Sequence, residues 1–250
     1  IGGISVPVIL AINPNTSAAM TDLMAGHLRN AVAADIEWKL INGRFGARYI
    51  SAEASYAIAG HAAIEAYAEH AHGIDAVLLA CFGDPGLFAL RELSTVPVIG
   101  LAEASMTEAA KRVPRFSIVT GGRRWGPMLN RLAEALGFSE SLVNVRTLSI
   151  TGAEIAANPD AAIELLATEC RKAQRVDGAG AVILGGAGLA GLAARVQEHV
   201  EVMLIDNVVA GARQAEALAW GGRVHYEHMP LGSVTPSIGV SPALARFLRD

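Results

Sequence analysis

Short apolar runs alternate with alanine-rich amphipathic segments along the whole chain. Apolar runs that are bounded by glycine, proline or asparagine are typical of buried strands, and the amphipathic segments between them are typical of helices. Strands that alternate with helices in this way form parallel sheets built from βα units. The pattern therefore predicts an α/β fold. The candidate strands are Val6–Ile12, Ile36–Ile41, Ala76–Cys81, Val96–Gly100, Phe116–Thr120, Val143–Leu148, Ala181–Leu184 and Val202–Ile205.

The candidate strands fall into two blocks on either side of Lys111–Arg115, a polar segment that contains a proline. Each block begins with a strand that ends in a polar or glycine-rich loop, at Asn13–Ser17 and at Thr120–Gly122. Each block also has a later strand that ends in a glycine-rich loop, at Cys81–Gly86 and at Gly185–Gly188. We interpret this order as two similar flavodoxin-like domains related by pseudo-twofold symmetry. The carboxyl ends of their sheets would face a shared cleft, which suits a small anionic or carbonyl-bearing molecule.

Composition narrows the class of protein. The chain has 250 residues, of which 52% are hydrophobic, so it can bury a substantial core. Its net charge is -4 and it has no run rich in lysine or arginine, which argues against a nucleic-acid partner. No apolar stretch approaches the roughly 18 residues that cross a membrane, and the N-terminus lacks the pattern of a secretory signal. We therefore expect a cytoplasmic protein without a membrane partner.

The two cysteines have different surroundings. Cys170 repeats with Leu166 and Ala173 on one apolar face of a predicted helix, so we expect it to be a small core residue. Cys81 ends an apolar strand and opens a glycine-rich loop, a position where α/β folds place chemistry. A disulfide between the two is not expected in a cytosolic protein.

The loop after Cys81 favours a reactive thiol. A free thiol has a pKa of about 8.5, and a nearby helix N-terminus can lower it toward neutrality. Gly83 and Gly86 allow close approach of the backbone, and Pro85 fits the first turn of a following helix. A thiol in this setting could exchange a proton with a carbon next to a carbonyl. The alternative interpretation is a buried cysteine in a tight turn.

Four segments resemble the hydantoin and allantoin racemases of the aspartate/glutamate/hydantoin racemase superfamily. They are Ile12–Ser17, Ala80–Leu87, Ile118–Gly122 with Trp125, and Ile183–Gly191. The resemblance implies a small-molecule substrate, no cofactor and a homo-oligomer. It also implies two thiols, one from each domain, that act as acid and base on opposite faces of the reacting carbon, and Cys81 corresponds to the first of them.

The same resemblance implies how the chain is divided. The segment after Asn207 is expected to return to the first domain, which then comprises residues 1–110 and 207–250. The second domain comprises residues 111–206.

The sequence departs from the family pattern at Gly186, where the second cysteine is expected. Another group or a water could protonate the second face, the position could differ from that of the natural protein, or the enzyme could work with one base. Arylmalonate decarboxylase, in the same superfamily, resembles this chain in having a single cysteine opposite a glycine, but its thiol is on the other domain. A decarboxylase using Cys81 would then give the product of opposite hand. A third class is a ligand-binding homologue without activity, in which Cys81 only packs.

Other residues are expected to complete the site. Asn13 is a candidate ligand for substrate oxygens, and Thr16 could either bind substrate or cap the following helix, with Ser17 inside that helix. Asp84 is expected to orient its loop through an Asx turn. The candidate anion-holding nest is Thr120, Gly121, Gly122, Gly186, Ala187 and Gly188, and the candidate lining is Ile41, Phe82, Gly83 and Trp125.

Two further motifs could indicate other kinds of site. Gly186–Gly191 satisfies G-x-G-x-x-G and Asp206 follows at a later strand end, which makes an NAD-dependent enzyme a rival class. The motif lies late in the chain, which argues against it. His70 and His72 are two residues apart and would face different ways on a helix. His225 and His228 lie in a segment bounded by glycine and proline without a helical pattern, so we predict no metal site.

Overall fold

The computed structural model describes residues 6–32, 35–221 and 237–248. Two four-stranded parallel sheets have the orders β2-β1-β3-β4 and β6-β5-β7-β8. Every predicted strand is present, so the α/β prediction is confirmed. The strands are β1 Val8–Asn13, β2 Glu37–Asn42, β3 Ala76–Leu79, β4 Val98–Gly100, β5 Phe116–Gly121, β6 Leu142–Leu148, β7 Ala181–Gly185 and β8 Met203–Asp206.

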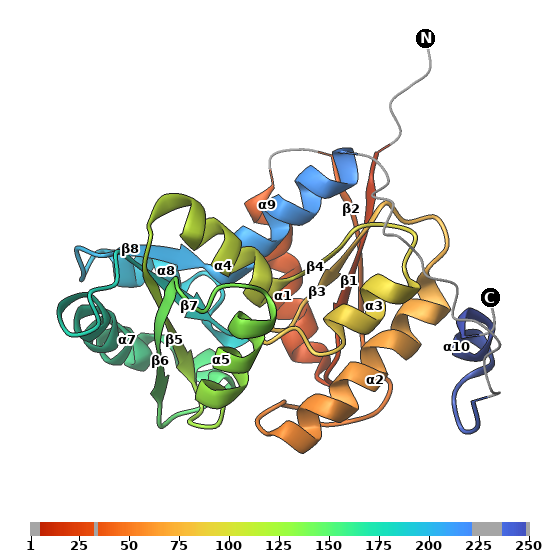
Figure 1. Cartoon of the computed structure of the whole chain (residues 1–250), viewed down its shortest axis with the longest axis horizontal. Coiled ribbons are helices and arrows are strands. Elements are labelled where there is room, and N and C mark those ends of the chain that lie inside the picture. The colour runs from red at the N-terminus through yellow and green to blue at the C-terminus, as the bar shows by residue number, and fades with distance from the viewer. Residues whose placement is uncertain (1–5, 33–34, 222–236, 249–250) are drawn as a thin grey trace, which may run out of the picture.

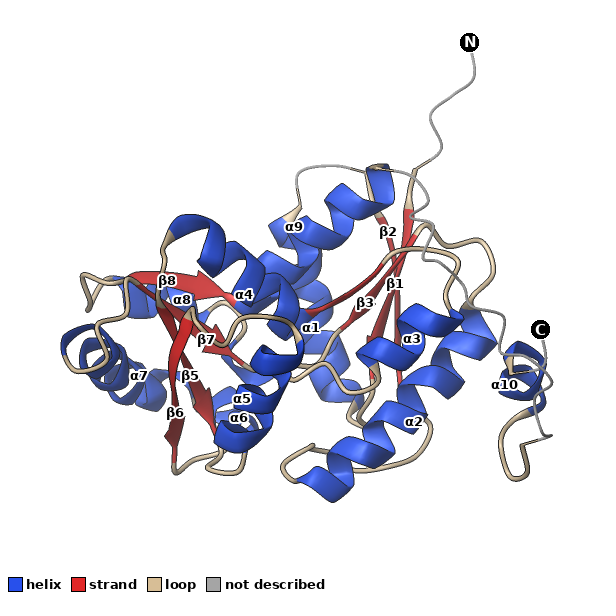
Figure 2. Cartoon of the chain, viewed as in Figure 1, coloured by secondary structure: helices blue, strands red, loops and turns tan. Residues whose placement is uncertain are grey.

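The two sheets are built alike, because in each the first strand of the block lies between the second and the third. Helices pack against both sheets, as Figures 1 and 2 show. The helices are α1 Ala18–Ala31, α2 Glu53–His70, α3 Leu87–Leu93, α4 Leu101–Arg112, α5 Trp125–Ala135, α6 Gly152–Ala157, α7 Pro159–Arg175, the 3-10 turn η1 Ala187–Leu189, α8 Leu192–Gln197, α9 Asn207–Trp220 and α10 Pro242–Phe247. None of the described helices is long and apolar enough to cross a membrane.

Two helices connect the first half of the chain, which contains β1 to β4, with the second half, which contains β5 to β8. Helix α4 leaves the first sheet and contacts β7 and β8 of the second, while α9 leaves the second sheet and contacts α1 and β3 of the first. In Figure 1 both helices lie between the two sheets. Helix α10 contacts α2. These contacts support the division of the chain that we propose, with residues 1–110 and 207–250 in one domain and residues 111–206 in the other.

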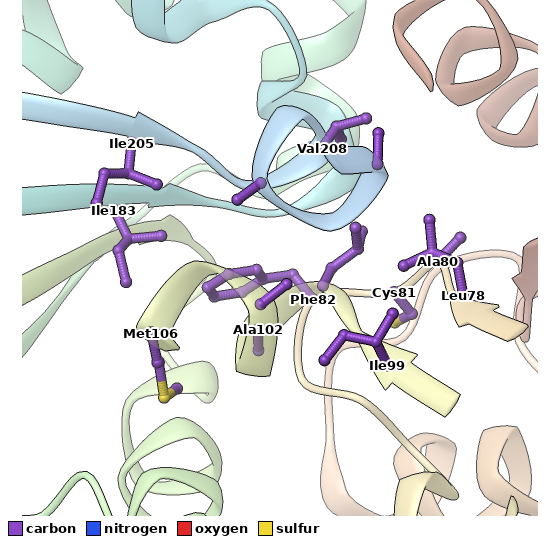
Figure 3. Packing of buried hydrophobic residues seen from close by; sticks show 14 of the residues in the cluster. Leu78, Ala80, Cys81, Phe82, Ile99, Ala102, Met106, Ile183, Ile205 and Val208 are labelled. Carbon is purple, nitrogen blue, oxygen red and sulfur yellow. The ribbon is translucent and has the colours of Figure 1, made fainter. Parts of the chain in front are cut away.

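The burial of the central strands explains why their positions could be predicted from the sequence. Every residue of β3, β5 and β7 is buried, as expected for central strands of parallel sheets covered on both faces. One apolar cluster continues from the first half into the second, and Figure 3 shows Phe82, Ala102 and Val208 within it. Cys170 is fully buried in a separate cluster of the second half, which confirms its predicted core position.

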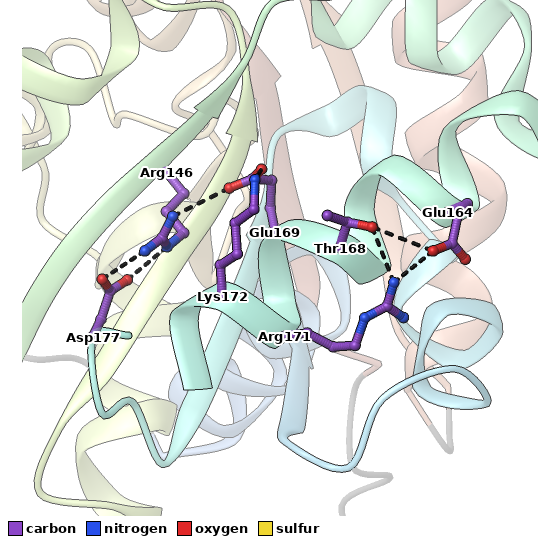
Figure 4. Close-up of polar contacts among 7 residues, drawn as sticks. All are labelled: Arg146, Glu164, Thr168, Glu169, Arg171, Lys172 and Asp177. Carbon is purple, nitrogen blue, oxygen red and sulfur yellow. Dashed lines mark hydrogen bonds and ion pairs between the residues drawn. The ribbon is translucent and has the colours of Figure 1, made fainter. Parts of the chain in front are cut away.

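Polar contacts hold the edge of the second sheet. Arg146 on β6 donates two hydrogen bonds of 2.7 Å to the Asp177 carboxylate and one of 3.3 Å to Glu169 on α7. Figure 4 shows this group beside the Arg171–Glu164 pair. Because the Arg146 and Asp177 side chains are mostly buried, the pair fixes β6 against the loop that leads to β7.

Candidate active site

A small cavity lies at the carboxyl ends of β3, β5 and β7. Residues from both halves of the chain line it, which places it where open α/β sheets bind ligands. Its lining residues are Asn15, Met20, Tyr49, Ile50, Ala80, Cys81, Phe82, Thr120, Trp125, Gly152, Gly185, Gly186, Ala187, Gly188 and Leu189.

Cys81 follows the buried strand β3, and its side chain belongs to the first-half wall of this cavity. The residue is only 8% exposed. Burial raises the pKa of the thiol well above its ordinary value, and the negative charge of Asp84 raises it further. The lowered pKa expected from the following helix is therefore wrong, because desolvation of the buried thiol dominates. The resting group is a neutral thiol.

Asp84 fixes the loop after Cys81 through contacts with residues that are distant in the sequence. It has a φ of 52° and is 1% exposed. Its carboxylate accepts hydrogen bonds from the backbone N–H groups of Ala102 at 3.0 Å and Glu103 at 2.8 Å, in the first turn of α4. Burial raises the pKa of Asp84 to about 7, although these two bonds oppose the shift. The loop is thus oriented through α4 and not through the local Asx turn that we expected.

Glycines next to Cys81 and across the cavity leave room for aromatic rings. A Cβ at Gly185 would lie 2.2 Å from the Phe82 ring, and one at Gly83 would lie 2.4 Å from the Trp125 ring. Gly83 also accepts a hydrogen bond of 2.8 Å from the Tyr56 hydroxyl through its carbonyl. Gly83 therefore does not line the cavity but leaves space for the Trp125 ring, which lines it together with Phe82.

The loop after β1 brings a different asparagine to the cavity. Asn13 donates to the Asn15 and Thr21 side chains, both at 2.9 Å, and it is Asn15 that lines the cavity. Ser17 caps α1 by accepting from the Met20 N–H at 3.3 Å, so the capping role considered for Thr16 belongs to Ser17. Asn13 thus positions Asn15.

The second-half wall contains the glycine that replaces the expected cysteine. Gly186 has a φ of 126°, in the range that favours glycine. A Cβ there would lie 3.4 Å from Leu189 and 3.8 Å from the Thr120 hydroxyl, which is ordinary contact. Asn207 holds this loop by donating to the carbonyls of Leu184 and Gly186 at 2.8 and 3.2 Å.

The structure brings together some of the residues proposed for the site. Those that line the cavity are Cys81, Phe82, Thr120, Trp125, Gly186, Ala187 and Gly188; those that do not are Asn13, Thr16, Ile41, Gly83, Gly121 and Gly122. Ile41 lines a separate hollow beside α2. Gly121 packs behind the site, where a Cβ would lie 2.7 Å from the Gly152 nitrogen.

Sequence reasoning missed Tyr49, Ile50 and Gly152. The first two lie in the loop between β2 and α2, and Gly152 begins α6. The Tyr49 hydroxyl accepts a hydrogen bond of 2.9 Å from the Gly152 N–H, so this loop of the first half reaches the second. The one available signal was a loop with two glycines, Gly43 and Gly46, directly after a predicted strand.

The structure does not support the dinucleotide-binding motif or a metal site among the described residues. The Asp206 carboxylate, which a dinucleotide site would need, accepts from the Gly191 N–H at 2.8 Å and caps α9. Among the described residues, no cluster of three or more histidine, cysteine or acidic side chains could hold a metal ion. His225 and His228 lie outside the described residues.

Comparisons with known proteins agree on one family. Residues 9–215 match the sequence profile of the family described as Asp/Glu/Hydantoin racemase. The chain is 35% identical over 211 residues to a hydantoin racemase of Pseudomonas sp. (strain NS671), with 84% of this chain and 85% of the relative covered. Allantoin racemase from Klebsiella pneumoniae has the same fold, with a TM-score of 0.82, 35% identity, and coverage of 88% of this chain and 91% of that one.

A mutant of arylmalonate decarboxylase in a liganded form is also similar. Its TM-score is 0.62 at 20% identity, and the match covers 87% of this chain and 94% of that one. This is a likeness of fold alone.

Proposed function

Because the chain belongs to the Asp/Glu/hydantoin racemase family, we propose that it is a racemase of a cyclic ureide, either a 5-substituted hydantoin or allantoin. It would invert the carbon next to a carbonyl without a cofactor. The observation that carries this proposal is the Cys81 thiol on one wall of a cavity shared by both halves. The activities named for the hydantoin and allantoin racemases that the chain resembles support the choice of substrate.

The surroundings of Cys81 fit such a proton transfer. Removing a proton next to a carbonyl requires a base at the carbon and hydrogen-bond donors at the oxygen where charge develops. Cys81 would act as base when ionised and as acid when protonated. The oxygen of the Asn15 amide accepts from the Asn13 side chain and the Ser17 N–H, both at 2.9 Å. Its NH2 group has no partner among the described residues and would donate to substrate. The Thr120 hydroxyl is a second donor on the opposite wall.

The test uses each pure enantiomer of a 5-substituted hydantoin, and of allantoin, in heavy water with the wild-type protein. Deuterium uptake and optical rotation are followed together. We expect uptake with loss of rotation from both enantiomers of at least one substrate. If no substrate takes up deuterium faster than without protein, the proposal is wrong.

Gly186 favours one second candidate, a decarboxylase with a single thiol. A residue without a side chain cannot deliver a proton to the second face, whereas a decarboxylase needs only one protonation. This candidate predicts release of carbon dioxide from a disubstituted malonate and a single product enantiomer. Racemisation without such release argues against it. A homo-oligomer and a cytoplasmic location remain predictions.

A further inference from the structure

Among the described residues, those of the second half contribute no acid or base to the cavity. Of the lining residues that the structure describes, only Cys81 and Tyr49 carry a side chain that titrates. A racemase must remove a proton from one face of the carbon and deliver one to the other. With glycine at position 186, a second group has to come from elsewhere in the cavity.

The Tyr49 hydroxyl lies on that second-half wall, although the residue belongs to the first half. It is bonded to the Gly152 N–H at 2.9 Å. The Gly152 carbonyl in turn lies against Gly188, where a Cβ would approach it to 2.0 Å. Gly188 is in the same short loop as Gly186. The hydroxyl is therefore held beside the loop that lacks the expected thiol, and Cys81 is on the other wall.

The hydrogen bonds at Tyr49 suit a group that gains and loses a proton. Its oxygen accepts from Gly152, and among the described residues no acceptor takes its hydroxyl hydrogen. Burial raises the pKa of Tyr49, and hydrogen bonds from Gly152 and Trp125 oppose the shift by stabilising the phenolate. The charge of an ionised Cys81 raises the pKa further, which fits two groups that face one cavity.

We propose that Tyr49 is the second acid/base residue and works opposite Cys81. This inference rests on the proposed racemase function. In one direction, the Cys81 thiolate takes the proton, and the electron pair of the broken C–H bond enters the enolate. The Tyr49 O–H bond then breaks as its proton forms a C–H bond on the other face. Cys81 is left as a thiol and Tyr49 as a phenolate, which is the starting state for the other enantiomer.

The test compares Tyr49→Phe with the wild type and two control variants of the full chain. Tyr67→Phe removes the same atom from a ring that is buried against Phe247, away from the cavity. Arg131→Gln breaks the two hydrogen bonds of 2.7 and 2.9 Å between Arg131 and Glu53, another contact between the halves. Each enantiomer of the hydantoin is incubated separately in heavy water, and deuterium uptake and rotation are measured.

We expect Tyr49→Phe to invert the substrate about 100-fold or more slowly than the wild type. It should still exchange the hydrogen of one enantiomer, the one facing Cys81, within about tenfold of the wild-type rate. Exchange of the other enantiomer should be lost, and Tyr67→Phe should behave as the wild type. If Tyr49 has only a structural role, its loss should slow the exchange of both enantiomers to the same extent. The same pattern is expected if Arg131→Gln loosens the contact between the halves.

Two results would overturn the assignment. If Tyr49→Phe racemises like the wild type, or loses exchange of both enantiomers equally, Tyr49 is not the second group, while wild-type racemisation still supports the proposed function. If the wild type itself neither exchanges nor racemises any 5-substituted hydantoin or allantoin, the function and the assignment are both wrong.

Discussion

At the scale of single residues, the burial of Cys81 predicts how the rate depends on pH. Burial and the charge of Asp84 raise the thiol pKa, so only a small fraction is ionised near neutral pH. That fraction grows about tenfold per pH unit below the pKa. We expect kcat/KM to rise steadily up to at least about pH 9, above the ordinary thiol pKa. A pH–rate profile of the wild type measures this, and a plateau near neutrality contradicts it.

Gly186 permits a second prediction, about stability. Its φ of 126° strains any other residue, although a Cβ has room. We expect Gly186→Ala to lower the free energy of unfolding by about 1 to 3 kcal/mol. The control is Gly26→Ala in α1, where nothing lies near the added Cβ and alanine should be neutral or stabilising. Urea unfolding compares the two variants, and equal stabilities would show that the loop readily adopts another conformation.

At the scale of elements, Asp84 couples the thiol loop to α4. The folded-state pKa of about 7 exceeds the ordinary value of about 3.9, so the folded protein binds this proton more tightly than the unfolded chain does. As pH rises through this window, the unfolded state ionises first and stability is lost. The loss contributed by Asp84 is on the order of a few kcal/mol.

Asp84→Asn removes this titration. The difference in unfolding free energy, wild type minus variant, should therefore decrease as pH rises from about 4 to about 7. Urea unfolding at a series of pH values measures the difference. A difference that does not change with pH would show that Asp84 is already ionised throughout, held so by its bonds to Ala102 and Glu103.

At the scale of the whole molecule, the sequence was informative where structure is local. Buried parallel strands such as β3 and β7 are continuous apolar runs, so their positions and the repeat of the two halves could be predicted. Cys81 could be found because a strand end is a local feature. The two-sheet fold and the racemase family were both predicted from such segments.

The rest of the site depends on contacts between distant segments. Which of Asn13 and Asn15 faces the cavity is decided by a turn and its hydrogen bonds. Tyr49 reaches the site only because its loop meets Gly152, more than a hundred residues away along the chain. The thiol pKa depends on burial in the folded chain and on the charge of Asp84. None of these contacts leaves a periodic pattern in the sequence.

The central claim is that Cys81 transfers the proton, and racemisation by Cys81→Ala tests it most directly. Cys170→Ala is the matched control, because it removes a thiol that is buried in the second-half core. The loss of optical rotation of a pure 5-substituted hydantoin is followed for both variants and the wild type. We predict that Cys81→Ala racemises about 100-fold or more slowly than the wild type, while Cys170→Ala keeps its activity. Racemisation by Cys81→Ala at the wild-type rate would contradict the account.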